Sequence, residues 1–321
     1  MSDVPQKQVL IAANPKSGAS SGRQAVAALR DALNDRGYST TIYDSLADLS
    51  RESDAASEAG RLRCVVSAGG DGTAAAVVNL IPATIPMVLF PLGTENLLAR
   101  YLGQTQSVEQ AVATVESGRE ILLDAGSAGG RLFLIMLSCG FDAHVVRELH
   151  SARKGHIRRS SYFKPIWQAM RSYRYPQIEI EIMDSGSPVV SGAERPGSAT
   201  ESRTELHIDD QRLQATWFFA FNLPRYAAGL PFCPQADGSD GKLDICTFRR
   251  GGTWRGLIYL SHLWFGRHQQ LQDFQHTKAR RFRLSSSEPI PYQVDGDPGG
   301  TLPLDVEVLP GRLRLLVPPT E

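Results

Sequence analysis

The chain has 321 residues, of which 42% are hydrophobic and 21% are charged, a composition typical of a globular protein with one large or two ordinary domains. Lysine plus arginine and aspartate plus glutamate both total 34, so the net charge favours no class of partner. The four cysteines show no CxxC spacing, which argues against zinc motifs and a disulfide framework and fits a reducing compartment.

Residues 8 to about 123 alternate short apolar strands with helical patterns. The predicted strands are 8–13, 39–43, 62–67 and 86–90. The predicted helices are about 21–36, 52–60, 73–81, 95–102 and 107–117. This alternation predicts a Rossmann-like α/β domain with a mostly parallel sheet covered by helices on both faces. Ligands of such sheets bind at the carboxyl ends of the strands.

After residue 124 strand patterns separated by Gly, Pro and Ser dominate, with one predicted helix at about 158–173. The predicted strands are 131–138, 177–183, 204–208, 213–222, 243–248, 280–285, 291–295, 304–308 and 312–317. They predict a β-sandwich-like second domain. The expected domains are 1–124 and 125–310, and whether a strand at 311–321 returns to the first domain is left open. Residues 185–203 are expected to form an exposed loop.

A glycine-rich turn, Gly69-Gly70-Asp71-Gly72-Thr73, follows one predicted strand and opens a predicted helix. Glycines let backbone N–H groups approach phosphate oxygens closely, and the N-terminus of a helix favours negative charge. Thr73 is placed to cap that helix. The carboxylate of Asp71 would repel a triphosphate unless it holds Mg²⁺ or accepts a proton. The turn therefore predicts phosphate binding, with an ordinary tight turn as the alternative.

Two further segments, Asn14-Pro15-Lys16-Ser17-Gly18 and Pro91-Leu92-Gly93-Thr94-Glu95-Asn96, also follow strands directly. We expect them to meet the glycine-rich turn at one edge of the sheet. Lys16 is suited to pair with phosphate, Thr94 to cap a helix, and Glu95 and Asn96 to face a nucleotide. Ordinary strand-to-helix turns are the alternative. The GxxxxGK[ST] and GxGxxG patterns are absent, which excludes a P-loop NTPase and weakens a dinucleotide-binding interpretation.

The NPxSG, GGDGT and PLGTxN sequences, in this order, resemble the catalytic domain of the diacylglycerol kinase family, which includes sphingoid-base, ceramide and bacterial lipid kinases. Downstream, Gly140-Phe141-Asp142-Ala143 resembles the family's GFDA segment. The stretch from Asn222 to Asp244 is similar to its N…GG…PxA…DGxLD pattern. Gln293-Val294-Asp295-Gly296-Asp297 resembles its QxDGE motif. The resemblance covers about residues 8–310.

This resemblance implies that ATP binds in a cleft between the α/β domain and a β-sandwich domain that takes the lipid substrate. Asp295 matches the general base that deprotonates the lipid hydroxyl, and Asp71 would help to place the catalytic Mg²⁺. Asp237 and Asp240 match a pair that binds a structural Mg²⁺ in some bacterial members. The alternative for Asp295 is an ordinary Asp-Gly hairpin turn. The alternative for Asp237 and Asp240 is a solvated loop. The residues implied at the nucleotide are Asn14, Ser17, Gly69, Gly70, Asp71, Gly72, Thr73, Thr94, Glu95, Asn96 and Asp297.

Two residues depart from the family pattern. Leu97 stands where many bacterial members carry Asp, and Asp297 stands where Glu is usual. We predict an enzyme, an ATP- and Mg²⁺-dependent kinase that transfers the γ-phosphate to a hydroxyl of a diacylglycerol-like or sphingoid membrane lipid. A kinase of a soluble substrate, similar to NAD kinase, is the first alternative. A catalytically weak nucleotide-binding regulatory protein, motivated by Leu97 and Asp297, is the second.

Residues 147–174 combine eight Lys or Arg residues with interleaved aromatic residues and one acid, Glu148. On a lipid kinase this composition fits a membrane-facing patch, and a solvated amphipathic helix is the alternative. No nucleic-acid motif accompanies it. The chain also shows no signal-peptide pattern and no apolar run near the 18 or so residues that span a bilayer. We expect a cytoplasmic protein, with peripheral membrane attachment and oligomeric state left open.

Overall fold

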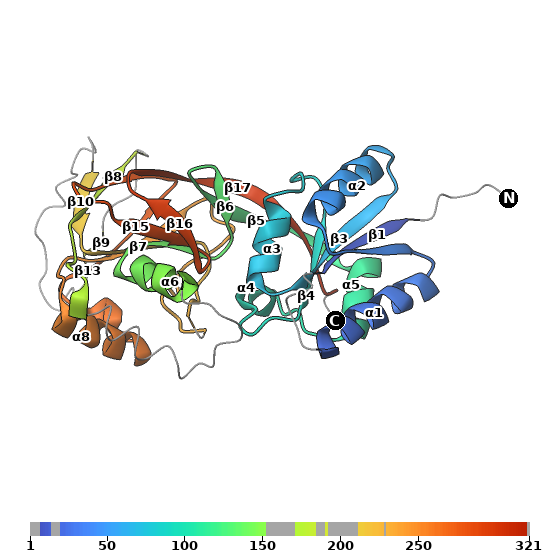
Figure 1. Cartoon of the computed structure of the whole chain (residues 1–321), viewed down its shortest axis with the longest axis horizontal. Helices are drawn as coiled ribbons and strands as arrows, with labels where there is room; N and C mark the ends of the chain where they lie inside the picture. The colour runs from blue at the N-terminus through green and yellow to red at the C-terminus, as the bar shows by residue number, and fades with distance from the viewer. Residues whose placement is uncertain are drawn as a thin grey trace, which may run out of the picture. The chain divides into compact units, whose positions relative to one another are not determined.

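The computed structural model describes residues 7–13, 20–151, 171–183, 190–191, 211–227 and 229–319. The chain divides by its internal contacts into two compact units. Unit 1 comprises residues 1–125 and 310–321, and unit 2 comprises residues 126–309. Helices and strands alternate in unit 1, whereas strands predominate in unit 2 (Figure 1).

Unit 1 is built around a parallel sheet. Its strands pair in the order β4-β3-β1-β2. The strands are β1 (Gln8–Ala13), β2 (Ser39–Tyr43), β3 (Leu62–Gly69) and β4 (Met87–Pro91). The helices are α1 (Ser20–Asp35), α2 (Leu46–Glu58), α3 (Asp71–Val78), α4 (Leu97–Tyr101) and α5 (Val108–Ser117). The predicted Rossmann-like α/β fold of the first half is thus confirmed.

Helices cover both faces of this sheet: α1 and α5 lie on one face, and α2 and α3 lie on the other (Figure 1). Residues Leu29 and Leu33 of α1 pack with Val115 of α5 against alternate strand residues such as Val9 and Val66. A strand buried on both faces must be apolar at nearly every position, which explains the continuous apolar runs in the sequence.

Unit 2 contains two antiparallel layers. The first is a seven-stranded sheet in the order β16-β15-β7-β11-β12-β13-β9. Its strands are β7 (Met136–Gly140), β9 (Val190–Ser191), β11 (Trp217–Phe221), β12 (Leu243–Phe248), β13 (Phe274–Ala279), β15 (Pro291–Val294) and β16 (Asp297–Thr301). The second layer contains β8 (Ile178–Ile182), β10 (Gln211–Ala215), β14 (Arg281–Ser285) and the first part of β17 (Leu304–Val317).

One apolar core joins the two layers of unit 2. Phe218 of β11 and Phe282 of β14 meet there, with ring centroids 5.5 Å apart. Because each layer turns one apolar face to the other, the predicted β-sandwich-like domain is confirmed. Two helices of eight or more residues are described in this unit, α6 (Phe141–Ser151) and α8 (Thr253–Trp264), with a short 3₁₀ helix at His268–Gln270.

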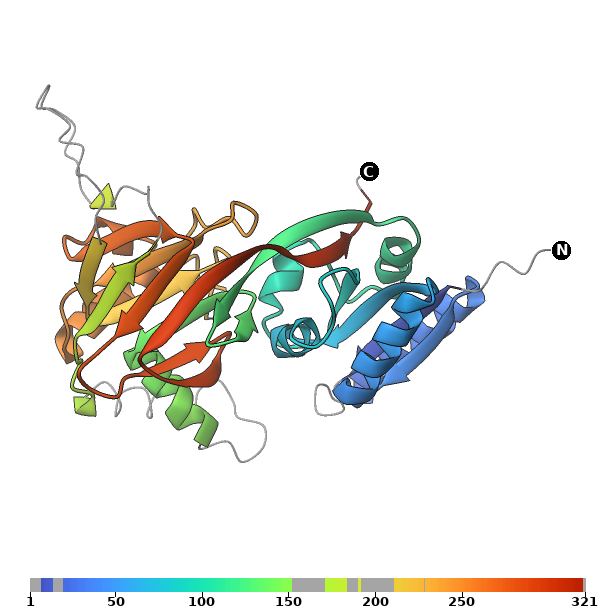
Figure 2. The same ribbon diagram turned by 90° about the horizontal axis from the view of Figure 1, so that it is seen from above.

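Strand β17 belongs to both units, because its residues 304–307 pair with β14 and Leu315 pairs with Met87 of β4. The predicted strands 304–308 and 312–317 are therefore one continuous strand. Strand β5 (Arg119–Ala128) pairs with β17 and with β6 (Arg131–Phe133), and Figure 2 shows β5 beside β17.

Several predicted elements differ from the observed ones. The predicted strand 213–222 is divided into β10 and β11 at Thr216, and 131–138 is divided into β6 and β7. The elements α6, α8, β5, β13 and β16 were not predicted. The predicted strand 204–208 lies outside the described residues. Most of the predicted helix 158–173 and of the loop 185–203 lies outside them as well, although β9 falls within that loop.

Helix α8 was missed because apolar residues lie on its exposed side as well as on its buried side, which weakens the amphipathic pattern. Among the described residues, no helix combines the length and apolar character that a membrane span needs.

Candidate active site

The end of β1, the segment after β2 and the start of α3 meet at the carboxyl edge of the unit 1 sheet. Of the three segments that we expected to meet there, the one after β1 lies outside the described residues. A pocket of about 170 Å³ lies there. It is lined by Ala12, Ala13, Asp44, Leu46, Gly72, Thr73 and Ala76. Asp44 was not predicted as a site residue, although an acidic residue directly after the second strand of such a sheet is a known ribose-binding position. Asn14 and Ser17 lie outside the described residues, and their roles stay predictions.

The glycines of two loops allow those loops to pack directly on each other. A Cβ added at Gly93 would lie 2.6 Å from the Cα of Gly70, a distance that real Cβ atoms do not show. Asn96 closes the second loop: its Oδ1 accepts the N–H of Gly93 at 3.0 Å, and its Nδ2 donates to the Gly93 carbonyl at 2.8 Å. Asn96 has a φ of 48°, the left-handed conformation that residues other than glycine adopt rarely. Gly93 is thus required for loop packing, whereas a Cβ added at Gly70 would make a tight contact of 3.3 Å with the Cα of Gly93.

Gly72 and Thr73 occupy the first turn of α3 and face different surroundings. Gly72 is exposed, and a Cβ added to it would meet no atom within 4 Å, so a ligand can approach its backbone. Thr73 is buried, and a Cβ added at Gly69 would lie 2.2 Å from its Oγ1. Because α3 begins at Asp71 with Gly70 as its N-cap, Thr73 does not cap the helix, contrary to our expectation.

Asp71 connects the glycine-rich turn to the start of α4. Its Oδ2 accepts the backbone N–H of Leu97 at 2.9 Å, and its Oδ1 accepts that of Leu98 at 3.0 Å. Burial raises the pKa of Asp71, although these two hydrogen bonds act in the opposite direction. The carboxylate of Glu95 raises the pKa further. The protein itself therefore holds Asp71 in place.

The segment around Thr94 differs from the expected helix start. Asn96 is the N-cap of α4, so Thr94, which is exposed, does not cap this helix. Glu95 is partly buried beside it. The side chain of Leu97 is buried, and its backbone N–H contacts Asp71. The departure at Leu97 thus places an apolar side chain in the core of unit 1.

Asp295 lies in the turn of the β15–β16 hairpin. Asp295 and Gly296 have φ values of 50° and 87°, as both central residues of a type I′ turn require. The carboxylate of Asp295 points back to the segment between β6 and β7. Its Oδ2 accepts the N–H of Leu134 at 2.7 Å, and its Oδ1 accepts those of Ile135 and Met136 at 2.9 and 3.0 Å. The hairpin turn and a fixed, stabilised carboxylate therefore occur together.

Asn222 holds the same segment from the other side. Its backbone N–H donates to the carbonyl of Ile135 at 2.8 Å, and its Nδ2 donates to the carbonyl of Leu134 at 2.8 Å. Asn222 is buried at the end of β11. Two motif segments that lie far apart in the sequence, around Asn222 and Asp295, thus meet at residues 134–136.

A second carboxylate, that of Asp142 at the start of α6, is connected to the same hairpin. Its Oδ2 accepts hydrogen bonds from Ser138 Oγ at 2.6 Å, Tyr226 OH at 3.2 Å and Gln293 Nε2 at 3.2 Å. Burial raises the pKa of Asp142, and these donors oppose that shift. Gln293 Oε1 in turn accepts the N–H of Gly296 at 2.7 Å. The GFDA and QxDGE segments therefore converge.

Tyr226 is a member of this network that sequence reasoning missed. Burial, followed by the charge of Asp142, raises the pKa of Tyr226 well above the ordinary tyrosine value. Tyr226 is therefore a neutral phenol, and its hydroxyl donates a hydrogen bond to Asp142. Its position between Asn222 and Gly229 of the matched stretch is the one sequence signal that points to it.

The acidic residues predicted to bind metal or nucleotide in unit 2 each have protein partners. Asp297 Oδ2 lies 3.0 Å from a guanidinium nitrogen of Arg131. Asp240 Oδ2 lies 2.6 Å from Nζ of Lys278, and a divalent cation there would have to displace that ammonium group. Asp237 Oδ1 accepts the hydroxyl of Ser239 at 2.7 Å. The metal role of Asp237 and Asp240 stays a prediction.

In the described part of the chain, donor atoms suited to a metal lie together at a different place, on Cys233, Asp244 and His276, all within 4.8 Å of one another. His276 Nε2 lies 2.7 Å from Asp244 Oδ1, which makes a direct ion pair. Burial alone would lower the pKa of His276, but the contacts with Asp244 and Cys233 outweigh it and raise the pKa to about 9.

Comparison with known proteins agrees with this geometry. Residues 8–128 match the diacylglycerol kinase catalytic domain, and residues 135–317 match the YegS C-terminal NAD kinase beta sandwich-like domain. The chain is 24% identical over 319 residues to a diacylglycerol kinase of Bacillus subtilis (strain 168), covering 97% of both. It is 26% identical over 261 residues to a diacylglycerol kinase of Mycobacterium tuberculosis, covering 79% of this chain and 76% of the relative.

Solved structures share the fold. Two structures assigned as diacylglycerol kinases from Bacillus anthracis str. Sterne have TM-scores of 0.69 and 0.60 at 18% and 17% identity. Both comparisons cover 98% of this chain, and they cover 96% and 97% of the respective structures. The motifs in unit 1 and the sandwich of unit 2 fall within the two matched domains. The chain therefore belongs to the family of kinases with a diacylglycerol kinase catalytic domain and a YegS-type C-terminal domain.

Proposed function

We propose that the protein is an ATP- and Mg²⁺-dependent lipid kinase that phosphorylates a hydroxyl of a diacylglycerol-like or sphingoid lipid. The observation that carries this proposal is the carboxylate of Asp295. It lies on a left-handed turn and is fixed by three backbone N–H groups. A positioned carboxylate of this kind suits proton transfer from a hydroxyl that attacks phosphorus.

Unit 1 supplies the nucleotide site in this proposal. The open backbone of Gly72 at the start of α3 faces the phosphates, and Asp44 accepts hydrogen bonds from the ribose hydroxyls. Mg²⁺, when bound, neutralises the negative charge that phosphoryl transfer develops on the phosphate oxygens. Asp71, fixed by Leu97 and Leu98, is the residue of unit 1 that would hold it. The roles of Thr94, Glu95 and Asn96 at the nucleotide belong to the same proposal.

Unit 2 supplies the acceptor site. Asp295 accepts the proton of the lipid hydroxyl. The three donated hydrogen bonds fix the orientation of the Asp295 carboxyl group before the lipid arrives. Phosphoryl transfer passes through a loose transition state, so a well-placed acceptor matters more than a strongly basic one. Asp142, Tyr226 and Gln293 hold the hairpin that carries Asp295 in its position.

The test is transfer of labelled phosphate from Mg·ATP to a panel of lipids in mixed micelles. The panel contains diacylglycerol, phosphatidylglycerol, sphingosine and ceramide, with NAD as a soluble acceptor. We expect transfer to one lipid class, and a loss of about two decades or more in kcat for Asp295→Asn with ATP binding unchanged. Asp305→Asn is the matched control, because it neutralises an exposed carboxylate of unit 2 that lies outside this hydrogen-bond network.

The alternatives give different results in the same assay. Phosphorylation of NAD would identify the soluble-substrate kinase, which the description of the matched C-terminal domain as NAD kinase-like keeps in view. Protein that binds ATP but produces no phosphorylated acceptor would favour a regulatory role. An equal loss of activity in both variants would contradict a special role for Asp295.

A further inference from the structure

Helix α8 has two apolar faces, of which the structure buries one. Gly256, Tyr259 and Leu263 face the seven-stranded sheet and are buried. The ring of Tyr259 stacks on Phe248 with centroids 4.3 Å apart. The hydroxyl of Tyr259 donates a hydrogen bond to the carboxylate of Asp273 and lies 3.0 Å from the carbonyl oxygen of Arg250. This face attaches the helix firmly to unit 2.

The opposite face and one flank of α8 carry large apolar side chains in contact with solvent. Trp254 is 79% exposed, Trp264 is 71% exposed, and Phe265, which directly follows the helix, is 74% exposed. Ile258 and Leu260 are exposed as well. Trp254, Ile258 and Phe265 recur at spacings of four and seven residues and so lie along one side of the helix. A surface helix normally presents charged residues there, and large exposed apolar patches mark interaction sites.

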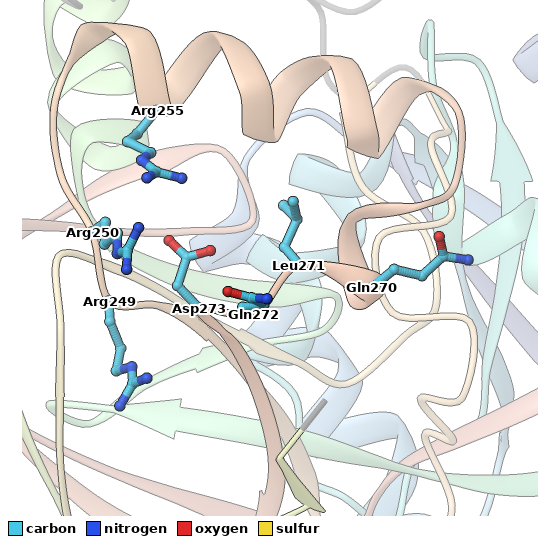
Figure 3. A pocket seen from close by; sticks show the side chains of 7 residues that line it. All are labelled: Arg249, Arg250, Arg255, Gln270, Leu271, Gln272 and Asp273. Carbon is cyan, nitrogen blue, oxygen red and sulfur yellow. The ribbon is translucent and has the colours of Figure 1, made fainter. Parts of the chain in front are cut away.

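The segment around this helix is strongly basic. Between Arg249 and Gln272 the sequence contains four arginines and no aspartate or glutamate. Three of these arginines line a pocket of about 440 Å³. The pocket is formed by Arg249, Arg250, Arg255, Gln270, Leu271, Gln272 and Asp273. Figure 3 shows Arg255 projecting from α8 toward Asp273, with Arg250 beside them.

The arginine charges of this pocket are not neutralised within the described part of the molecule. Arg249, Arg250 and Arg255 form no ion pair with any described carboxylate. Asp273 is the one acidic residue that lines the pocket, and it is 5% exposed and accepts the hydroxyl of Tyr259. The pocket therefore has a net positive charge and suits an anionic group such as a phosphate.

We propose that α8, Phe265 and the arginine pocket form a docking surface for an anionic phospholipid bilayer. Trp254, Trp264 and Phe265 enter the boundary between headgroups and acyl chains, and the arginines bind headgroup phosphates. A helix of 12 residues is about 18 Å long, too short to cross the apolar core of a bilayer, so it lies in the plane of the interface. The choice of a bilayer rests on the proposed lipid kinase function.

The charges favour a bilayer over a second copy of this chain. In a two-fold dimer the same patch meets itself, so the three pocket arginines of one copy would be brought close to those of the other. Like charges brought together in this way repel each other. An anionic bilayer offers the opposite charge, and its interface is the environment in which tryptophan side chains are enriched in membrane proteins.

The test is flotation of the full chain with two kinds of vesicle, phosphatidylcholine alone and phosphatidylcholine with about one third phosphatidylglycerol. The aromatic variant is Trp254→Ser/Trp264→Ser/Phe265→Ser. The arginine variant is Arg249→Gln/Arg250→Gln/Arg255→Gln. Two variants in unit 1 serve as matched controls: Leu80→Ser/Leu122→Ser for exposed apolar residues, and Arg30→Gln/Arg36→Gln/Arg51→Gln for the same change in net charge. Circular dichroism verifies that each variant is folded.

We expect the wild type and both controls to bind the anionic vesicles. The arginine variant should bind those vesicles about a hundredfold more weakly, because each of its three arginines near an anionic surface contributes about fivefold. The aromatic variant should lose about tenfold or more on both kinds of vesicle. Tryptophan emission of the wild type should shift to shorter wavelength on binding, as exposed indoles leave water. That readout needs no variant.

Three results would overturn the proposal: no vesicle binding by the wild type, equal loss in the control variants, or binding unaffected by both test variants. Light scattering adds a fourth. A wild-type dimer that the aromatic variant dissociates in the absence of lipid would assign the surface to a second copy. Vesicle binding is measured without ATP, and kinase activity is measured separately on a water-soluble short-chain diacylglycerol. Vesicle binding without kinase activity would reject the proposed function but not the docking surface. Kinase activity without vesicle binding would reject the docking surface but not the proposed function.

Discussion

The carboxylate of Asp71 accepts the backbone N–H of Leu97 at 2.9 Å and thereby joins the turn after β3 to the start of α4. Leu97 is the residue that departs from the pattern of many bacterial relatives. Its side chain is 8% exposed and belongs to the core of unit 1. The departure thus leaves intact the backbone contact that orients Asp71, so it does not by itself argue for an inactive protein.

Replacing Asp71 by alanine should lower both stability and activity. Asp71→Ala leaves the N–H groups of Leu97 and Leu98 without an acceptor, which costs about 1–3 kcal/mol when such groups stay buried. Urea unfolding measures the loss. Asp48→Ala, which removes an exposed carboxylate from the first turn of α2, should cost clearly less. Equal costs for the two variants would mean that the contact with α4 does not stabilise unit 1.

Two glycines of the same region should respond differently to alanine. Gly93→Ala brings a Cβ within 2.6 Å of Gly70 and forces the two loops apart, which we expect to cost about 1–3 kcal/mol. Gly72→Ala adds a methyl group to open space within α3 and should leave stability unchanged or slightly raised. The same methyl group should raise the KM for ATP if phosphate approaches Gly72. An unchanged KM would exclude that approach.

The stability of the protein should depend on pH through Asp142. Because burial raises the pKa of Asp142, the folded state binds this proton more tightly than the unfolded state. The contribution of Asp142 to stability therefore decreases as the pH rises above the ordinary carboxyl pKa near 3.8. Asp142→Asn removes this dependence while its amide oxygen still accepts from Ser138 and Tyr226. The free energy of unfolding of the variant relative to wild type should therefore increase between pH 4 and pH 7. A difference that does not change with pH would contradict the raised pKa of Asp142.

His276 should give a pH dependence of the same direction as Asp142, but over a higher pH range. Its pKa is raised to about 9 in the folded protein, against about 6.5 when exposed. The ion pair with Asp244 therefore contributes its full stability below about pH 6.5 and loses it as the pH rises through about 9. The stability difference between wild type and His276→Gln should shrink over this range in denaturant titrations. His150→Gln, at an exposed position on α6, is the control and should show no such trend.

The sequence by itself determined the fold class and the family, because both depend on local patterns. Alternating strands and helices predict a parallel sheet. The sequences after β1, β3 and β4 contain motifs that can be recognised one by one and that follow one another in the family's order. Gly70 was expected near phosphate. The structure shows that it also lies where the loop after β3 touches Gly93 of the loop after β4. Local sequence marks such a glycine but does not say whether a ligand or another loop approaches it.

Tertiary structure alone decided which side chains meet. Asp295 bonds to Ile135, 160 positions earlier in the chain, and Gln293 bonds to Asp142, 151 positions earlier. Such contacts depend on how antiparallel strands are paired, which no local pattern specifies. The exposure of α8 was decided in the same way. Its apolar residues are indistinguishable in sequence from core residues, and only the packing of Tyr259 and Leu263 against the sheet turns Trp254 toward solvent.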